Sequence, residues 1–230
     1  MTTAEKPRLL PLAAKPAGQL LVHEIYRSLQ GESTYAGLPC VFVRTTACDL
    51  RCTWCDTPHA FTQGTPYTLD AVLAKVAEFE TPLVEITGGE PLLQAETLPL
   101  MARLCDAGHT VLLETSGARD ISAVDRRVHV IMDLKCPDSG EADANLWSNL
   151  DILKPTDEIK FVIASADDFC WAERAIREHR LAERFGVLVS PVFGNVVSRE
   201  LAEWVLASGL NVRMQLQLHK QIWEPDMRGV

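Results

Sequence analysis

Apolar runs alternate along the chain with segments of helical spacing. The runs that predict strands are residues 20–25, 40–45, 83–86, 111–113, 128–132, 159–163, 187–189 and 212–218. Apolar residues recur every three or four positions in residues 68–80, 96–107, 167–180 and 198–206, which predicts helices, the first with Thr68 as its cap. The strand runs are near-continuous, as is typical of strands covered on both faces. The pattern therefore predicts an α/β fold with a helix-covered parallel sheet.

The pattern also indicates how the chain is divided. The first 18 residues contain three prolines and no periodic apolar pattern. We therefore expect residues 1–19 to form a flexible N-terminal arm. No internal repeat or low-complexity linker divides the rest, so residues 20–230 are expected to form one domain.

Polar or glycine-containing segments follow several of the predicted strands. They are residues 44–56, 87–90, 114–117, 133–135 and 190–191. In parallel α/β folds, binding sites gather at the carboxyl ends of the strands. Packing alone does not explain polar residues at so many strand ends, so the sequence predicts one shared pocket there.

Composition and charge narrow the kind of partner. Of the 230 residues, 47% are hydrophobic and 23% charged, values typical of a soluble globular protein. The apolar runs are far shorter than a membrane span, and the N-terminus lacks the layout of a signal peptide. A net charge of −9 argues against nucleic acid as the partner, because nucleic-acid binding depends on a basic surface. We expect a small-molecule substrate.

Three of the seven cysteines lie in one short loop, Cys48, Cys52 and Cys55, at C-x3-C-x2-C spacing. Structural zinc takes four closed ligands, whereas a [4Fe–4S] cluster held by three thiolates keeps one iron open. A zinc loop or a chance grouping remains an alternative. We expect the other cysteines (Cys40, Cys105, Cys136 and Cys170) to be small buried hydrophobes. Free thiols indicate a reducing compartment, hence a cytoplasmic protein.

Other segments offer candidate binding groups, each with a structural alternative. Residues 87–91 (T-G-G-E-P) place two glycines at a strand end, where a ligand can approach the backbone; a plain tight turn is the alternative. Lys135 at a strand end is the better site candidate, whereas Lys160 could extend to solvent. Gln215, Gln217 and His219 would share one face of a strand, either solvated or facing a polar heterocycle.

The motifs together resemble a known family. The cysteine spacing with an aromatic residue before Cys55, and the Gly-Gly turn, are similar to those of the radical S-adenosylmethionine (SAM) superfamily. Within it, the order of L-Q-G-E (29–32), Arg44, C-D-T (55–57), E-T-S-G (114–117) and Q-L-H-K (217–220) resembles the 7-carboxy-7-deazaguanine synthase family. The resemblance implies an incomplete parallel (β/α) barrel with trimmed helices, and a homodimer.

The resemblance also implies an activity. It is the radical SAM-dependent ring contraction of 6-carboxy-5,6,7,8-tetrahydropterin to 7-carboxy-7-deazaguanine with release of ammonia, a carbon–nitrogen lyase reaction on the route to queuosine and other 7-deazapurines. The implied cofactors are a [4Fe–4S] cluster, SAM and Mg²⁺. An electron donor such as flavodoxin or ferredoxin would be the protein partner, and no nucleic acid or membrane would be involved.

The resemblance implies roles for individual residues as well. Cys48, Cys52 and Cys55 would hold the cluster, and Thr57 would place Mg²⁺. The residues implied in SAM binding are Trp54, Cys55, Asp56, Gly88, Gly89, Glu114, Ser116, Asp133, Leu134, Lys135, Ser190, Pro191, Val192 and Phe193. The residues implied in pterin binding are Leu29, Gln30, Gly31, Glu32, Arg44, Thr87, Gln217, His219 and Val230. No side chain is expected to act as an acid or base in the reaction, with Glu32 left as an open option.

Two departures and two rival functions stay open. Residues 133–135 read Asp-Leu-Lys where many family members have Ser-Pro-Lys, and five residues follow Pro225, where some members end. The terminal carboxylate contact of those members would be lost, or passed to Val230 or Arg228. The rivals are an activase that forms a glycyl radical on a partner protein, and a zinc-binding or electron-transfer module.

Overall fold

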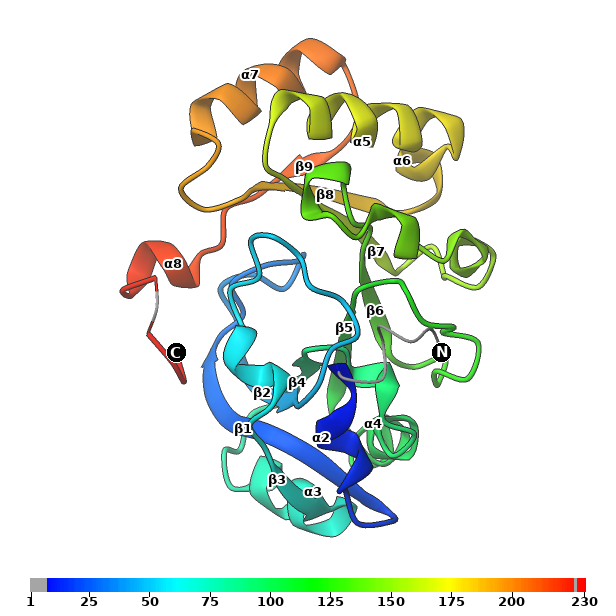
Figure 1. The fold of residues 1–230 in the computed structure, drawn as a ribbon, viewed down its shortest axis with the longest axis vertical. Helices are drawn as coiled ribbons and strands as arrows, with labels where there is room; N and C mark the ends of the chain where they lie inside the picture. Colours follow the sequence, from blue (N-terminus) through cyan, green and yellow to red (C-terminus); the bar gives the residue numbers. More distant parts are fainter. Residues whose placement is uncertain (1–7, 226) are drawn as a thin grey trace.

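One open sheet organises the protein (Figure 1). The computed structural model describes residues 8–225 and 227–230, and in them nine strands lie in the order β3-β1-β2-β4-β5-β6-β7-β8-β9. Their bounds are β1 Gln19–Leu29, β2 Pro39–Thr45, β3 Thr65–Thr68, β4 Leu83–Gly88, β5 Thr110–Thr115, β6 His129–Asp133, β7 Glu158–Ile163, β8 Gly186–Pro191 and β9 Arg213–Met214.

The sheet is parallel from β2 to β9, and β1 runs antiparallel to both β2 and β3. Strands β3 and β9 are its two edges and do not pair, so the sheet stays unclosed. The predicted α/β fold with an incomplete parallel barrel is confirmed. Strand β1 extends four residues past the predicted run because it is antiparallel and half-solvated, so its apolar residues alternate instead of forming a run.

Helices cover the outer face of this sheet (Figure 1). They are α3 Leu69–Ala77, α4 Thr97–Asp106, α5 Ala166–Glu178, α6 Leu181–Arg184 and α7 Ser198–Ser208, while α2 Leu10–Ala13 and α8 His219–Ile222 are short helices near the two ends of the chain. Thr68 caps α3 as predicted, its Oγ1 accepting a hydrogen bond from the Ala71 amide at 3.2 Å. Only short 3₁₀ turns join β6 to β7, so the helical layer is trimmed there. No helix in the described part of the chain is both long and apolar enough to cross a bilayer.

The two faces of the sheet differ in chemistry. Alternate strand residues such as Val84 and Ile86 pack under the helices in the large core. The residues between them face the other way and form a small apolar layer low on the strands: Cys40, Phe42, Leu83, Leu112 and Ile131. Two positions further along, the same face carries Arg44, Glu85, Glu114, Asp133 and Lys160. The face of the sheet away from the helices therefore carries its polar side chains together, next to the small apolar layer.

The C-terminal segment corrects one expectation. Residues 212–218 do not form one strand: β9 covers only Arg213 and Met214, and His219 begins α8. The Gln215 amide still donates to the Val189 carbonyl at 3.0 Å, but Pro191 has no N–H with which to continue the ladder. The chain leaves the sheet at this point, so Gln215, Gln217 and His219 do not share a strand face.

Two further expectations concern the N-terminus and the scattered cysteines. Residues 1–7 of the expected arm lie outside the described residues; Arg8 contacts the cysteine loop, donating to the Asp49 carbonyl at 2.6 Å. The division into arm and domain stays a prediction. Cys40 and Cys136 are buried as predicted and Cys105 partly so. Cys170 is exposed, contrary to the prediction, because it lies on the solvent side of α5.

Candidate functional site

The cysteine loop follows β2 and is held by charged side chains on either side. Arg51 donates from its side chain to the Cys48 carbonyl at 2.8 Å, and from its amide to Glu141 at 2.6 Å. Arg119 forms an ion pair with Asp49 of the loop. Burial raises the pKa of the Cys48 thiol to about 12, so without a metal this sulfur stays protonated. These contacts fix the loop independently of its sulfurs.

The Gly-Gly turn after β4 lies against the start of this loop. The amides of Gly89 and Glu90 donate to the carbonyls of Thr45 and Ala47 at 3.2 and 2.9 Å. A Cβ at Gly89 would lie 2.2 Å from the Ala47 oxygen, and one at Gly88, whose φ is +156°, would lie 2.3 Å from Thr45 Oγ1. The turn accepts only glycine there, and Ala47 itself has φ +81°, an uncommon strain for a residue with a side chain.

Glu90 ties this turn to the end of β5, as expected of a structural carboxylate. It is fully buried and accepts hydrogen bonds from the Ser116 amide at 2.8 Å and the Ser116 hydroxyl at 2.6 Å. The Thr115 hydroxyl and the Leu92 amide also donate to it, at 2.9 and 3.0 Å. The Ser116 hydroxyl is therefore engaged by Glu90.

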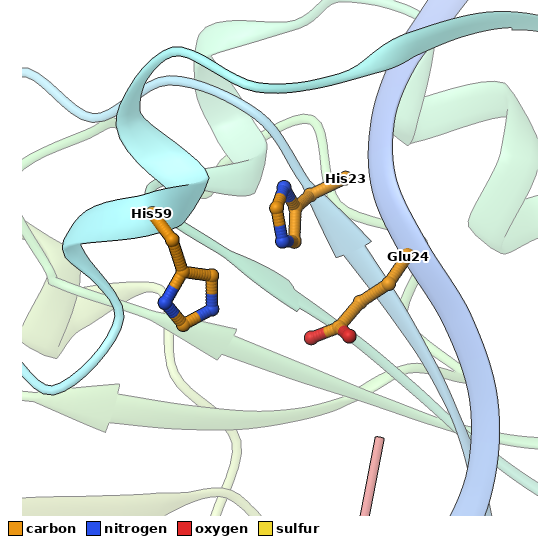
Figure 2. Close-up of side chains that lie close together, drawn as sticks. All are labelled: His23, Glu24 and His59. Atoms are coloured by element: carbon orange, nitrogen blue, oxygen red, sulfur yellow. The ribbon is translucent and has the colours of Figure 1, made fainter. Parts of the chain in front are cut away.

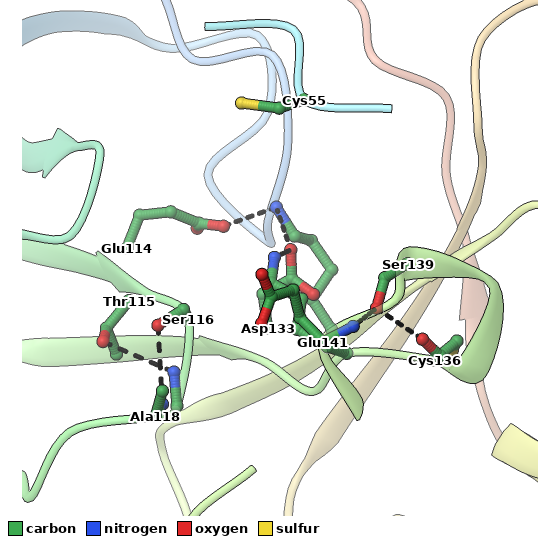
Figure 3. Close-up of polar contacts among 12 residues, drawn as sticks. Cys55, Glu114, Thr115, Ser116, Ala118, Asp133, Cys136, Ser139 and Glu141 are labelled. Atoms are coloured by element: carbon green, nitrogen blue, oxygen red, sulfur yellow. Dashed lines mark hydrogen bonds and ion pairs between the residues drawn. The ribbon is translucent and has the colours of Figure 1, made fainter. Parts of the chain in front are cut away.

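A buried lysine lies among three carboxylates at the strand ends. Lys160 Nζ on β7 is 2.6 Å from Glu32 Oε2 and 3.8 Å from Asp133 Oδ2, and it donates a hydrogen bond to Glu114 Oε1. We call Lys160, Glu32, Glu114 and Asp133 the carboxylate–lysine cluster. Figure 3 shows the Glu114 and Asp133 side chains at their neighbouring strand ends, with dashed lines marking polar contacts that each of them makes. Asp133 also pairs with Lys135, at 2.8 Å.

The protonation states in and near the cluster follow from burial and mutual charge. Burial lowers and the carboxylates raise the pKa of Lys160; the carboxylates prevail, so it stays protonated. Burial opposes the ionisation of Glu32, but Lys160 outweighs it and lowers the pKa of Glu32. Burial raises the pKa of Glu114 to about 8 and that of Glu85, on β4, to about 7. The Lys160 ammonium thus stabilises the ionised form of Glu32, while the carboxyl groups of Glu85 and Glu114 hold protons near neutral pH.

Arg44 is fixed beside this cluster. Its Nε donates to Glu24 Oε1 at 2.8 Å, and one terminal nitrogen donates to the Tyr26 hydroxyl at 3.0 Å. Burial lowers the pKa of Arg44, but Tyr26 and Glu24 raise it by more than burial lowers it, so the guanidinium stays charged. Its remaining N–H groups have no partner among the described residues and can bind a planar anion such as a carboxylate.

The C-terminal segment packs against the loop after β1. The Leu218 amide donates to the Gly31 carbonyl at 2.9 Å, and Gln217 Nε2 donates to Glu32 Oε1 at 2.8 Å. His219 lies so close that a Cβ at Gly31 would be 2.2 Å from its Nδ1. Burial lowers the pKa of His219, which favours the neutral ring. The two segments that carry the L-Q-G-E and Q-L-H-K motifs are thus in direct contact.

The other residues singled out in the sequence lie around these groups with differing exposure. Gln30 donates to Glu85, Lys220 lies 2.8 Å from Asp56, and Thr57 Oγ1 is 3.9 Å from the Cys55 sulfur. Trp54 and Leu29 are partly buried, Thr87, Ser190, Pro191 and Val192 are buried, and Phe193 is exposed. Pro191 and Phe193 line a groove of about 240 Å³ with Leu216, Gln217 and Gln221.

Leu134 and Val230, two residues implied in ligand binding, do not bring their side chains to the carboxylate–lysine cluster. The Leu134 side chain is fully buried in the core beneath the helices, and its amide donates to the Lys160 carbonyl at 2.9 Å. Val230 makes no hydrogen bond to the cluster within residues 8–225 and 227–230. The role implied for Leu134 is therefore limited to its backbone carbonyl.

Glu85 was not predicted from the sequence, and for Lys160 the sequence allowed both a solvent-exposed position and a position in the site. Glu85 lies in an apolar run, V-E-I, where an unpaired carboxylate is costly, so its position was a usable signal. Only the register of β7 beside β6, which pairs Lys160 with Asp133, reveals that Lys160 faces the cluster. Glu24 and Tyr26 were not predicted because they act by holding Arg44 from the neighbouring strand, and the pairing of β1 with β2 is not visible in the sequence.

The cysteine loop and the residues around it fit a [4Fe–4S] cluster and a SAM molecule. The three loop cysteines are free thiols, and the Gly-Gly turn beside them leaves backbone accessible to a ligand. Two predicted SAM contacts, Asp133 Oδ1 and Ser190 Oγ, are buried without a hydrogen-bond partner in the described part of the chain. Buried polar atoms without partners are rare and costly, so a bound polar group would satisfy them.

Comparisons with known proteins agree with this site. Residues 42–185 match the radical SAM superfamily. The chain is 47% identical to a 7-carboxy-7-deazaguanine synthase of Chlorobaculum tepidum (92% of this chain, 97% of the relative) and 47% identical to one of Koribacter versatilis (91% and 99%). The crystal structure of QueE from Escherichia coli shares the fold, with a TM-score of 0.74, 22% identity, and coverage of 91% of this chain and 99% of that one. The chain belongs to the 7-carboxy-7-deazaguanine synthase family of the radical SAM superfamily.

Proposed function

We propose that this protein converts 6-carboxy-5,6,7,8-tetrahydropterin to 7-carboxy-7-deazaguanine with release of ammonia, as a carbon–nitrogen lyase in queuosine and 7-deazapurine biosynthesis. Family membership at 47% identity over more than nine-tenths of the chain supports the proposal. The observation that carries it in the structure is the contact between the 29–32 loop and residues 217–219, beside the carboxylate–lysine cluster. A pterin needs donors and acceptors of this kind along its guanidine-like edge.

As a radical SAM enzyme, the chain uses a [4Fe–4S] cluster and SAM, which together supply the one-electron chemistry that starts the reaction. Cys48, Cys52 and Cys55 would hold the cluster. The Gly88–Gly89 turn would present backbone groups to the SAM amino acid, and Asp133 and Ser190 would give their unpartnered oxygens to its polar atoms. Glu90 contributes by holding the turn, not by touching the ligand.

In the substrate pocket, an ionised carboxylate and two protonated carboxyl groups would together orient the pterin. Glu32, ionised beside Lys160, would accept N–H groups of the pterin, and Gln217 holds its second oxygen in place. Glu85 and Glu114, with raised pKa values, would offer O–H donors near neutral pH. Gln30 donates a hydrogen bond to Glu85, which holds that carboxyl group in place, and would face the same edge of the pterin.

The substrate carboxylate would bind Arg44, whose planar fork is preset by Glu24 and Tyr26. Thr57 would place Mg²⁺ on the same carboxylate, since a hard cation prefers oxygen ligands. Gly31, Thr87 and His219 complete the substrate set, and we expect no side chain to act as an acid or base in the reaction, with Glu32 as the open option. No side-chain nucleophile is required.

The wider setting is part of the same proposal. We expect a cytoplasmic homodimer whose domain spans residues 20–230, reduced by a flavodoxin or ferredoxin. Seven free cysteines support a reducing compartment.

The test is direct. The anaerobically reconstituted protein is incubated with SAM, dithionite, Mg²⁺ and 6-carboxy-5,6,7,8-tetrahydropterin, and ammonia and product mass are measured. One ammonia released per deazaguanine formed supports the proposal. SAM cleavage without ammonia release would keep the superfamily chemistry and remove the substrate. Omitting Mg²⁺ from a metal-free preparation tests its role separately.

A further inference from the structure

We propose that His23, Glu24 and His59 form a binding site for one divalent transition-metal ion of the zinc type, separate from the cysteine loop and from the Mg²⁺ expected at Thr57. One ligand atom from each side chain lies within 4.8 Å of the other two. Figure 2 shows both imidazole rings and the carboxylate turned toward one another, His23 and Glu24 from β1 and His59 from the turn Pro58–Phe61. The inference does not rest on the proposed function.

A β-bulge places the two neighbouring residues of β1 together. In a regular strand His23 and Glu24 would point to opposite faces. The register shifts here: Val22 is opposite Thr45 while Glu24 is opposite Arg44, so two steps on β1 match one step on β2. A bulge re-aims the side chain of the extra residue, and bulges occur frequently beside functional sites. His23 and Glu24 therefore face the same side.

Both histidines have a nitrogen available for a metal. His23 Nδ1 lies 2.8 Å from the Gln63 carbonyl, which only accepts, so Nδ1 carries the proton and Nε2 keeps its lone pair. A backbone carbonyl bound to the second nitrogen is the usual way in which a metal-binding histidine is oriented. The His59 ring, 4.9 Å from that of His23, has no hydrogen-bond partner within the described residues.

Glu24 supplies the third ligand without losing its contact to Arg44. Its Oε1 accepts from Arg44 Nε at 2.8 Å, and its Oε2 has no protein donor within residues 8–225 and 227–230. The carboxylate can thus bind Arg44 with one oxygen and a metal with the other. Its negative charge also reduces the repulsion between the guanidinium and the added cation.

The donor set selects the kind of ion. Two imidazole nitrogens and one carboxylate oxygen suit zinc and its neighbours, whereas Mg²⁺ and Ca²⁺ prefer oxygen throughout. Tetrahedral zinc, with bonds of about 2.0–2.2 Å, brings its ligands to about 3.3 Å from one another. The set must close further, and His59 can rotate because no hydrogen bond from the described residues holds its ring. Three protein ligands leave the fourth position to water.

A bound ion would join β1 to the turn Pro58–Phe61, which directly follows the cysteine loop. It would also share Glu24 with Arg44. The expected consequence is a protein more stable in zinc, with the cysteine loop tied to the first strand of the sheet.

The test uses the full-length protein with its iron–sulfur cluster assembled, so that the loop cysteines are occupied. Zinc content after equilibration with buffered Zn²⁺ and gel filtration is measured by mass spectrometry, with zinc-edge X-ray absorption for the ligands. We expect one zinc per chain with nitrogen and oxygen ligands at about 2.0–2.2 Å. His59→Ala and His23→Ala should each weaken zinc binding by at least the roughly tenfold that loss of an outer partner costs.

His109→Ala is the matched control, since this histidine lies outside the set, and it should retain the zinc. Sulfur ligands at about 2.3 Å would place the zinc in the cysteine loop and overturn the proposal. Equal zinc in the wild type and in both histidine variants would overturn it too. A thermal shift with Zn²⁺ that His59→Ala abolishes and His109→Ala keeps would support it.

Discussion

Lys160 Nζ lies 2.6 Å from Glu32 Oε2, a contact that links β7 to the loop after β1 across 128 residues of sequence. Both side chains are largely shielded from solvent, Lys160 being 7% exposed and Glu32 14%. Because the sheet is unclosed, its first and later strands are not joined by backbone hydrogen bonds. The ion pair joins the two sides of the polar face in their place.

Replacing this lysine should therefore cost stability as well as substrate binding. Lys160→Met leaves the ionised Glu32 buried without its cation and Glu114 without its hydrogen-bond donor, and breaking a buried pair in this way costs about 3 kcal/mol or more. In a chain of this size that corresponds to a fall in Tm of roughly 6–12 °C. We also expect a raised KM for the pterin. Thermal unfolding and steady-state kinetics measure the two effects.

The matched control is Lys75→Met. Lys75 pairs with Glu78 on α3, but both side chains are largely exposed, and pairs of that kind contribute little. Its Tm should stay within about 2 °C of that of the wild type, since surface substitutions change stability by under about 0.5 kcal/mol. Equal losses in the two variants would contradict a special role for Lys160.

Gly89→Ala should disturb the turn that faces SAM. The added Cβ would lie 2.2 Å from the backbone oxygen of Ala47 and 2.8 Å from the Cβ of Cys48, so backbone must move. We expect a cost of about 1–3 kcal/mol and weaker SAM binding, measured by calorimetry on the cluster-loaded protein. Gly186→Ala is the control: its Cβ would be 3.6 Å from the nearest atom, an ordinary contact, so stability should be unchanged or slightly higher. Normal SAM affinity in Gly89→Ala would refute the close approach.

The parallel part of the fold was predictable, and the reason is physical. Val84 and Ile86, or Val111 and Leu113, lie in runs apolar enough to mark central strands, and Thr68 marked the start of α3. The edges were less visible. Strand β3 is four residues long with little apolar content, and β9 stops because of Pro191, a residue on another strand.

The candidate site was predictable where its residues lie close together in the sequence. The cysteine loop and the Gly-Gly turn each form one short segment, so their spacing alone indicated them. Lys160 and Glu85 look like isolated charges in apolar strands, and only the sheet register gives them partners. The contact between Gly31 and His219 depends on the C-terminal segment leaving the sheet, which local pattern does not reveal.

Cys52→Ala should abolish cluster assembly and leave the protein folded. Cys52 is partly buried and belongs to neither apolar core cluster, so the loss of one sulfur costs little packing. Two thiolates do not hold a cubane cluster that needs three from the protein. Iron and sulfide content after anaerobic reconstitution should fall to background, while Cys170→Ala, an exposed cysteine on α5, should assemble normally. Full iron content in Cys52→Ala would refute the ligand assignment.

The raised pKa of Glu114 should make stability depend on pH in a defined direction. The carboxyl group holds its proton up to about pH 8 in the folded protein but releases it near 4.5 when unfolded. Between these values the folded state binds more protons, so the free energy of unfolding falls as pH rises. The contribution is complete below pH 4.5 and is lost as the pH passes about 8. Glu85, whose pKa is about 7, acts in the same direction.

Glu114→Gln removes one of these protons while keeping an acceptor for Lys160. The Tm of the wild type relative to this variant should therefore decrease steadily from about pH 5 to pH 8, measured without SAM or substrate at fixed ionic strength. Glu200→Gln, at an exposed position on α7, should show no such trend against the wild type. Parallel curves for the wild type and Glu114→Gln would mean that Glu114 is ionised in the folded protein, and the proposed O–H donor to the pterin would be lost with it.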